Sequence, residues 1–61
     1  MKTANRIATV GESILIVKPT IGSDYSKGDT FTVYETYDDL VEVEEHAQDV
    51  FHSEYVVIQN V

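Results

Sequence analysis

The sequence predicts an all-β fold: a small barrel of four to five antiparallel strands, with one long loop and a short helical turn before the last strand. Apolar residues recur with a period of about two, where a helix would give about 3.6. Glycine, proline and small polar residues divide the apolar runs into short segments, as between the strands of a β protein. Residues 45–53 have roughly helical spacing, but this stretch is too short to form a stable helix alone.

The length sets a second constraint on the fold. A chain of 61 residues forms a single domain, 1–61, with a core near the lower size limit. It has no cysteine, so neither a disulfide nor a thiolate metal site can stabilise it. Barrel closure, or a homodimer, would help by covering the sheet edges.

The N-terminal half is expected to hold a tail, two strands and the long loop. Residues 1–5 are predicted to be a flexible tail and residues 6–10 a weak first strand. Residues 13–17 form a β-branched run between Gly11 and Pro19, as expected of a buried strand. Glycine, serine and proline crowd residues 19–28, which predicts a long loop.

Residues 30–35 and 40–44 alternate between apolar and polar side chains and are expected to pair as a hairpin around residues 36–39. Phe31, Val33, Val41 and Val43 face inward in this arrangement. The predicted register sets Val33 opposite Val41, Phe31 opposite Val43, Thr32 opposite Glu42 and Thr30 opposite Glu44. Residues 45–53 are expected to form a loop with one short helical turn, and residues 54–58 the last strand.

The segments at residues 10–17, 25–33, 40–43 and 54–58 together resemble the Src-homology-3-like (KOW-like) small β-barrels of the bacteriophage and prophage type. The resemblance covers about 50 residues. It implies a single interaction domain, encoded by a phage and acting in the cytoplasm of the host cell. Relatives that bind nucleic acid carry basic loops, whereas the loops here are acidic or neutral, so no direct nucleic-acid binding is expected.

The distribution of charge is the strongest functional signal. Residues 28–61 hold nine acidic residues and no lysine or arginine, and the whole chain has a net charge of −7. Ordinary soluble surfaces mix the two signs. We therefore expect an acidic surface that mimics a nucleic-acid backbone, binds a basic bacterial nucleic-acid-binding protein and inhibits it. The predicted partner-binding residues are Tyr34, Tyr37, Asp38, Asp39, Glu42, Glu44, Glu45 and Asp49.

In an alternative interpretation, the chain is a generic Src-homology-3-like interaction or structural module, and its acidic face serves only solubility.

Charge spacing bears on the mimicry of a nucleic-acid backbone. Outward residues on one strand repeat every ~6.8 Å, whereas one DNA strand carries a charge every ~3.4 Å. Loop acids would therefore have to supply the missing charge density.

The four tyrosines are divided between surface and core. Tyr25, Tyr34 and Tyr37 are expected on the surface, where tyrosine is enriched in binding hot spots. Tyr55 is expected in the core.

Other functions find less support in the sequence. His46 and His52, with Glu45 and Asp49, match no metal motif, and Asp38 and Asp39 lie in no calcium-loop pattern. No enzyme activity, metal or cofactor is predicted. Four basic residues against eleven acids would repel phosphate, which disfavours direct nucleic-acid binding by Lys2, Arg6, Lys18 and Lys27.

Two further expectations follow from composition. The first residues lack the apolar run of a signal peptide, and no apolar run reaches the ~20 residues of a membrane helix, so the protein is expected in the cytoplasm, away from membranes. Crowded carboxylates are expected to repel one another and to raise their pKa values. Stability would then increase as the pH falls from about 7 to about 5, and on addition of salt.

Overall fold

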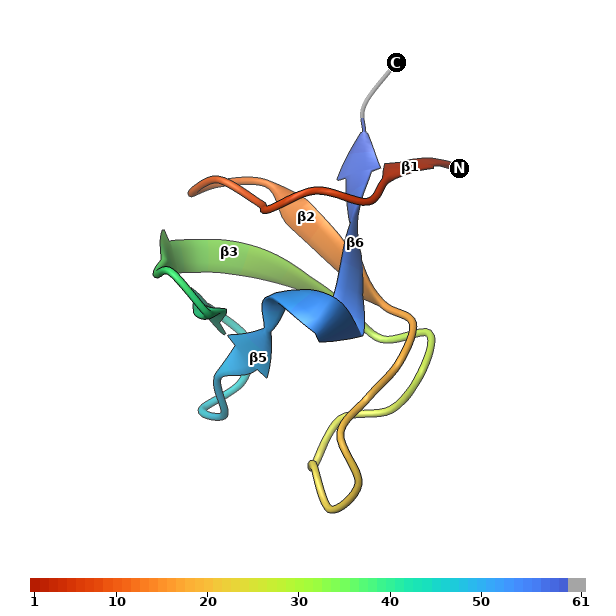
Figure 1. Cartoon of the computed structure of the whole chain (residues 1–61), viewed down its shortest axis with the longest axis vertical. Coiled ribbons are helices and arrows are strands. Elements are labelled where there is room, and N and C mark those ends of the chain that lie inside the picture. The colour runs from red at the N-terminus through yellow and green to blue at the C-terminus, as the bar shows by residue number, and fades with distance from the viewer. Residues whose placement is uncertain (60–61) are drawn as a thin grey trace.

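The computed structural model describes residues 1–59, which form an all-β domain of six antiparallel strands in one sheet (Figure 1). The all-β prediction is confirmed, with more strands than the four to five expected. The sheet order is β1-β6-β2-β3-β4-β5, so β1 and β5 are its edges. The strands are β1 (Lys2–Ala4), β2 (Ser13–Ile16), β3 (Thr30–Thr36), β4 (Leu40–Val43), β5 (Val50–Phe51) and β6 (Tyr55–Gln59).

The core lies on the inward face of this curled sheet. Alternate residues of β2, β3, β4 and β6 are buried, as period-two side chains require. The buried apolar residues are Ala8, Ile14, Ile16, Tyr25, Phe31, Val33, Val41, Val43, Val50, Tyr55 and Val57. The inward prediction for both hairpin strands and for Tyr55 is therefore confirmed. The surface prediction for Tyr25 is wrong, because its side chain is only 6% exposed.

The N-terminal segment differs from the prediction. Residues 2–4, expected to belong to a tail, form β1 and pair with the end of β6. The strand expected at residues 6–10 is absent from the described sheet. Two of its backbone N–H groups donate to side chains instead of a neighbouring strand: Ala8 to the Tyr55 hydroxyl at 3.0 Å, and Thr9 to the Glu12 carboxylate at 2.8 Å. Side chains thus satisfy backbone donors that a strand would have used.

The predicted hairpin exists, but its predicted register is wrong. Val33 lies opposite Val43, not Val41, and the expected Phe31–Val43, Thr32–Glu42 and Thr30–Glu44 pairs are replaced. Phe31 pairs with Ile14 of β2. A shift by two residues keeps every valine on the inward face, so the apolar pattern could not distinguish the two registers. The longer β3 and the tight turn at residues 37–39 decide between them.

The remaining connections follow the predicted order. Residues 17–29 form the long loop between β2 and β3, which extends to the far end of the long axis from the N-terminus (Figure 1). The helical turn predicted before the last strand is confirmed as the 3-10 helix η1 (His52–Glu54). The two-residue strand β5 precedes it and was too short to predict from a pattern. No helix in residues 1–59 is long and apolar enough to cross a membrane.

Candidate functional site

Two carboxylates lie directly opposite one another on the outer face of β3 and β4, and a third, Asp49, lies in the segment just before β5. Glu35 of β3 is directly opposite Glu42 of β4. Val41 pairs with Val50, and Asp49 is the residue before β5, so continuing this antiparallel register by one residue would set Asp49 next to Glu42. Adjacent strands are about 4.8 Å apart. We call Glu35, Glu42 and Asp49 the carboxylate row.

A β-bulge creates this row. The register shifts between Val33 and Glu35, so β3 advances by two residues while β4 steps back by one. Without the shift, Glu35 would face inward-pointing Val41 and could not align with Glu42. The bulge also leaves Tyr34 unpaired in the ladder, with its side chain 63% exposed.

Tyr37 lies over the row, in the turn after β3. Its hydroxyl donates a hydrogen bond to Glu42 Oε1. This bond raises the pKa of Tyr37 to about 12, with smaller contributions from burial and from the negative charges of Glu42, Glu35 and Asp49. The negative charges of all three carboxylates therefore disfavour the phenolate form of Tyr37.

The turn that carries Tyr37 is held by a chain of hydrogen bonds from the core. His52 Nε2 lies 2.7 Å from the Tyr37 carbonyl, and Nδ1 lies 2.6 Å from the buried Tyr55 hydroxyl. A carbonyl can only accept, so Nε2 carries the proton, and Nδ1 of the neutral ring accepts from Tyr55. The Tyr37 N–H closes the turn on the Leu40 carbonyl at 2.8 Å. The phenol over the row is thus fixed in position.

The structure brings only part of the predicted site together. Tyr37 contacts Glu42, Asp49 lies just before β5, and the exposed Asp38 and Asp39 lie on the turn that follows Tyr37. Glu44 and Glu45 lie at the other end of β4. Glu35 belongs to the row, although it was not among the predicted partner-binding residues. Its position depends on the bulge, and no sequence pattern announced a register shift.

Glu45 differs from the acids of the row because it is used within the fold. Its two carboxylate oxygens accept hydrogen bonds from the Thr32 N–H at 2.7 Å and the Thr32 hydroxyl at 2.8 Å. Burial acts to raise the pKa of Glu45, but the bonds from Thr32 outweigh it and leave the pKa lowered. Glu45 thus satisfies a backbone donor of β3 and is a structural residue.

A second acid that the sequence did not single out is the buried Glu54, only 2% exposed. Its Oε1 accepts from the Thr20 N–H at 2.6 Å and the Thr20 hydroxyl at 2.7 Å. The Tyr25 hydroxyl donates to the same carboxylate, and the Phe51 N–H donates to Oε2 at 2.8 Å. Burial raises the pKa of Glu54, yet these hydrogen bonds together lower it. The sequence signal for its burial was its position at the start of the apolar run 55–58.

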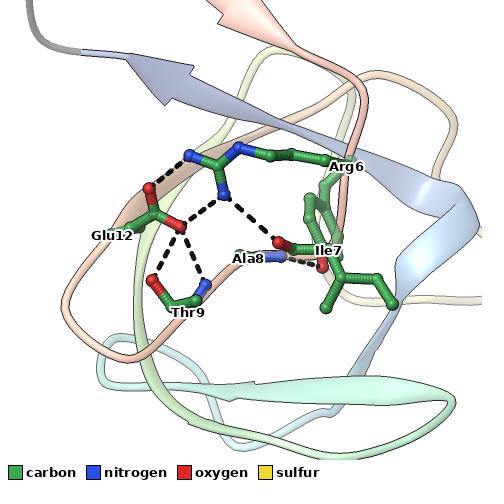
Figure 2. Close-up of polar contacts among 6 residues, drawn as sticks. Arg6, Ile7, Ala8, Thr9 and Glu12 are labelled. Carbon is green, nitrogen blue, oxygen red and sulfur yellow. Dashed lines mark hydrogen bonds and ion pairs between the residues drawn. The ribbon is translucent and has the colours of Figure 1, made fainter.

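Glu12 forms an ion pair with Arg6, which is the salt bridge found among the described residues (Figure 2). The guanidinium binds both carboxylate oxygens, at 2.9 and 2.6 Å, and Thr9 donates two further hydrogen bonds. The bond from Arg6, followed by that from the Thr9 backbone, lowers the pKa of Glu12 to about 2. This pair lies on the segment before β2, whose backbone bonds to Val33 of β3.

The expectation that crowding raises carboxylate pKa values is therefore wrong for the acids whose pKa shifts. The pKa values of Glu12, Glu45 and Glu54 are all lowered, because hydrogen-bond donors surround each of these carboxylates. Donors within the fold, and not repulsion, decide their ionisation.

Neither metal chemistry nor known relatives add to this picture. Within residues 1–59, no group of three or more histidine and carboxylate side chains could hold a metal ion. Comparisons with protein families, with curated proteins and with solved structures find no match to this chain.

Proposed function

We propose that this protein is a Src-homology-3-like small barrel that binds a basic surface of a bacterial nucleic-acid-binding protein and inhibits it by taking the place of the nucleic-acid backbone. The order of elements supports the barrel: a long loop after β2, the β3-β4-β5 meander, a 3-10 turn, and β6 returning to pair with β2. Phage origin and action in the host cytoplasm belong to the same proposal.

The carboxylate row is the observation that carries the proposal. Charges along one strand would repeat every ~6.8 Å, but charges across neighbouring strands repeat every ~4.8 Å. The second spacing is much closer to the ~3.4 Å per charge of a DNA strand. The direction across the strands therefore imitates a backbone better than any single strand could.

The row carries no compensating positive charge. Residues 28–61 contain no lysine or arginine. Among the described residues, the acid that forms a salt bridge is Glu12, with Arg6, and it does not belong to the row. Like charges directly opposite one another in a sheet are destabilising. The fold nevertheless places Glu35 against Glu42, which is expected when a partner supplies the missing cations.

Binding would proceed in two steps. The negative potential of residues 28–61 steers a basic protein toward this face and speeds association. Tyr34 and Tyr37, 63% and 49% exposed, then provide aromatic contacts beside the row.

The alternative of a generic module with a solubilising surface has one observation in its favour. Glu42 and Glu45 both have hydrogen-bond partners within the fold, so part of the acidic surface already has a structural role.

The experiment compares two double variants that remove the same charge. Glu35→Gln with Asp49→Asn removes two carboxylates of the row, whereas Asp24→Asn with Glu44→Gln removes two exposed carboxylates elsewhere. Each immobilised protein is exposed to bacterial heparin-binding proteins and then to duplex DNA as competitor. The row variant should bind about tenfold more weakly or worse at low salt, and the matched control should bind as the wild type does.

DNA should release whatever the wild type retains. Equal binding by the row variant and the control, or a protein that holds DNA and this chain at once, would leave solubility as the role of the acids.

A further inference from the structure

The long loop presents one fully exposed apolar side chain at a tight turn. Ser23 N–H donates to the Thr20 carbonyl at 3.1 Å, and Gly22 has φ of 88°. A positive φ at the third position of such a turn is the reason for glycine there. Ile21, at the second position, is 101% exposed. Burial in this chain cannot explain an isoleucine at that place.

The buried Glu54 fixes the loop on both sides of Ile21. Thr20, immediately before it, donates two hydrogen bonds to Glu54, and Tyr25, four residues after it, donates through its hydroxyl. The Asp24 N–H also donates to Gln48 Oε1 at 2.8 Å. Burying a carboxylate is costly unless donors surround it. Here Thr20 and Tyr25 of the loop supply donors in addition to the Phe51 N–H, so the fold uses this carboxylate to hold the loop around Ile21.

Ile21 lies at the edge of a pocket between the loop and β5. The pocket has a volume of about 280 Å³, and its lining includes Ile21, Tyr25, Asp49 and Phe51. The Phe51 side chain is 46% exposed there. This volume is just below the ~300–1,000 Å³ of small-molecule sites, so it suits a side chain of another protein. Asp49 belongs both to the pocket and to the carboxylate row.

We infer that this pocket and Ile21 together receive an apolar side chain of the basic partner, next to a lysine or arginine that reaches Asp49. The inference rests on the proposed function and names the contact that gives it specificity. Charge complementarity selects the partner, because the lining of the pocket includes the acidic Asp49 and no basic residue, and residues 28–61 contain no lysine or arginine. An apolar centre with a charged rim is the usual anatomy of a binding hot spot.

Anchoring also favours affinity. A loop that is already held by Glu54 loses little conformational freedom when a partner binds, which lowers the entropic cost of association. Thr20 and Tyr25 thereby serve as positioning residues for the contact at Ile21.

Two synthetic peptides of equal length and charge serve as probes: one alternates lysine with leucine, the other lysine with serine. Affinity is measured by titration, with the Ile21 methyl signals followed by NMR. The wild type should bind the leucine peptide at least about tenfold more tightly than the serine peptide, and the Ile21 signals should shift.

Ile21→Ser should abolish that preference while the serine peptide binds unchanged. Val10→Ser, which removes another exposed apolar side chain, 57% exposed, is the matched control and should keep the preference. Glu35→Gln with Asp49→Asn should weaken both peptides.

The outcomes separate the two proposals. Salt-sensitive binding of both peptides with equal affinity would overturn the pocket and retain the carboxylate row. Binding of neither peptide would count against both. If the wild type is a dimer in sedimentation that Ile21→Ser dissociates, the occupant is a second copy of this chain and the inference is wrong.

Discussion

Glu54 and the carboxylate row show two opposite uses of the same side-chain chemistry. Glu54 is buried, and its carboxylate accepts hydrogen bonds from Thr20, Tyr25 and Phe51. In the row, Glu35 and Asp49 are exposed, and the described residues place no cation beside them. The first arrangement joins the long loop to η1, and the second leaves negative charge facing solvent.

The difference teaches that net charge alone does not describe this surface. An acid surrounded by internal donors stabilises the fold and has little left for a partner. An acid opposite another acid costs stability and keeps its charge for binding. The acids therefore differ in their surroundings: Glu54 is buried among several donors, whereas the exposed Glu35 accepts a local bond from the Thr36 N–H at 3.2 Å.

The largest expected effect comes from removing the buried carboxylate of Glu54, which is the structural acid in this comparison. Glu54→Gln replaces an acceptor of several hydrogen bonds by an amide and should lower the free energy of unfolding by about 3 kcal/mol. For a domain of this size, the melting temperature should fall by about 12 °C or more. Glu44→Gln, at an exposed position, is the control and should change stability by less than about 0.5 kcal/mol. Equal melting temperatures for the two variants would contradict the anchoring role of Glu54.

The second prediction concerns stability in acid. The folded-state pKa values of Glu12, Glu45 and Glu54 lie below the unfolded value of about 4.3. The unfolded chain therefore binds more protons than the folded chain in this range, and stability decreases as the pH is lowered. These groups stabilise the fold fully above about pH 5, and their contribution is lost toward about pH 2, where Glu12 titrates. The gain first expected between pH 7 and pH 5 should be absent.

Chemical denaturation at a series of pH values checks this prediction. Glu12→Gln should show a smaller loss between pH 5 and pH 2 than the wild type, because one of the shifted groups is removed. A wild type that becomes more stable over that interval would show that repulsion among the acids outweighs their internal hydrogen bonds.

The smallest expected effect is a change in the pKa of Tyr37, which tests whether the carboxylate row acts on this side chain. Tyr37 should ionise near pH 12, because its hydroxyl donates a hydrogen bond to Glu42 and the negative charges of the row disfavour a phenolate. Glu42→Gln should move this pKa toward the usual value of about 10. NMR of the Tyr37 ring carbon, with Glu44→Gln as control, measures the shift. An unchanged pKa in Glu42→Gln would mean that the row does not act on Tyr37.

Local patterns were sufficient for much of the fold. Alternation placed Phe31, Val33, Val41 and Val43 inward, because side chains on a strand point to opposite faces in turn. Turn residues marked the long loop, and the segregation of acids after residue 28 is visible in the sequence alone. These features depend on neighbours in the chain.

Tertiary structure alone decided the register, the carboxylate row and the burial of Tyr25. The bulge that aligns Glu35 with Glu42 preserves the apolar pattern, so that pattern could not reveal it. Thr20 and Tyr25 meet Glu54 across 34 and 29 residues of sequence, and Tyr25 is buried for that reason. Such contacts depend on which donors and acceptors the folded chain brings together, whereas alternation is a property of each strand by itself.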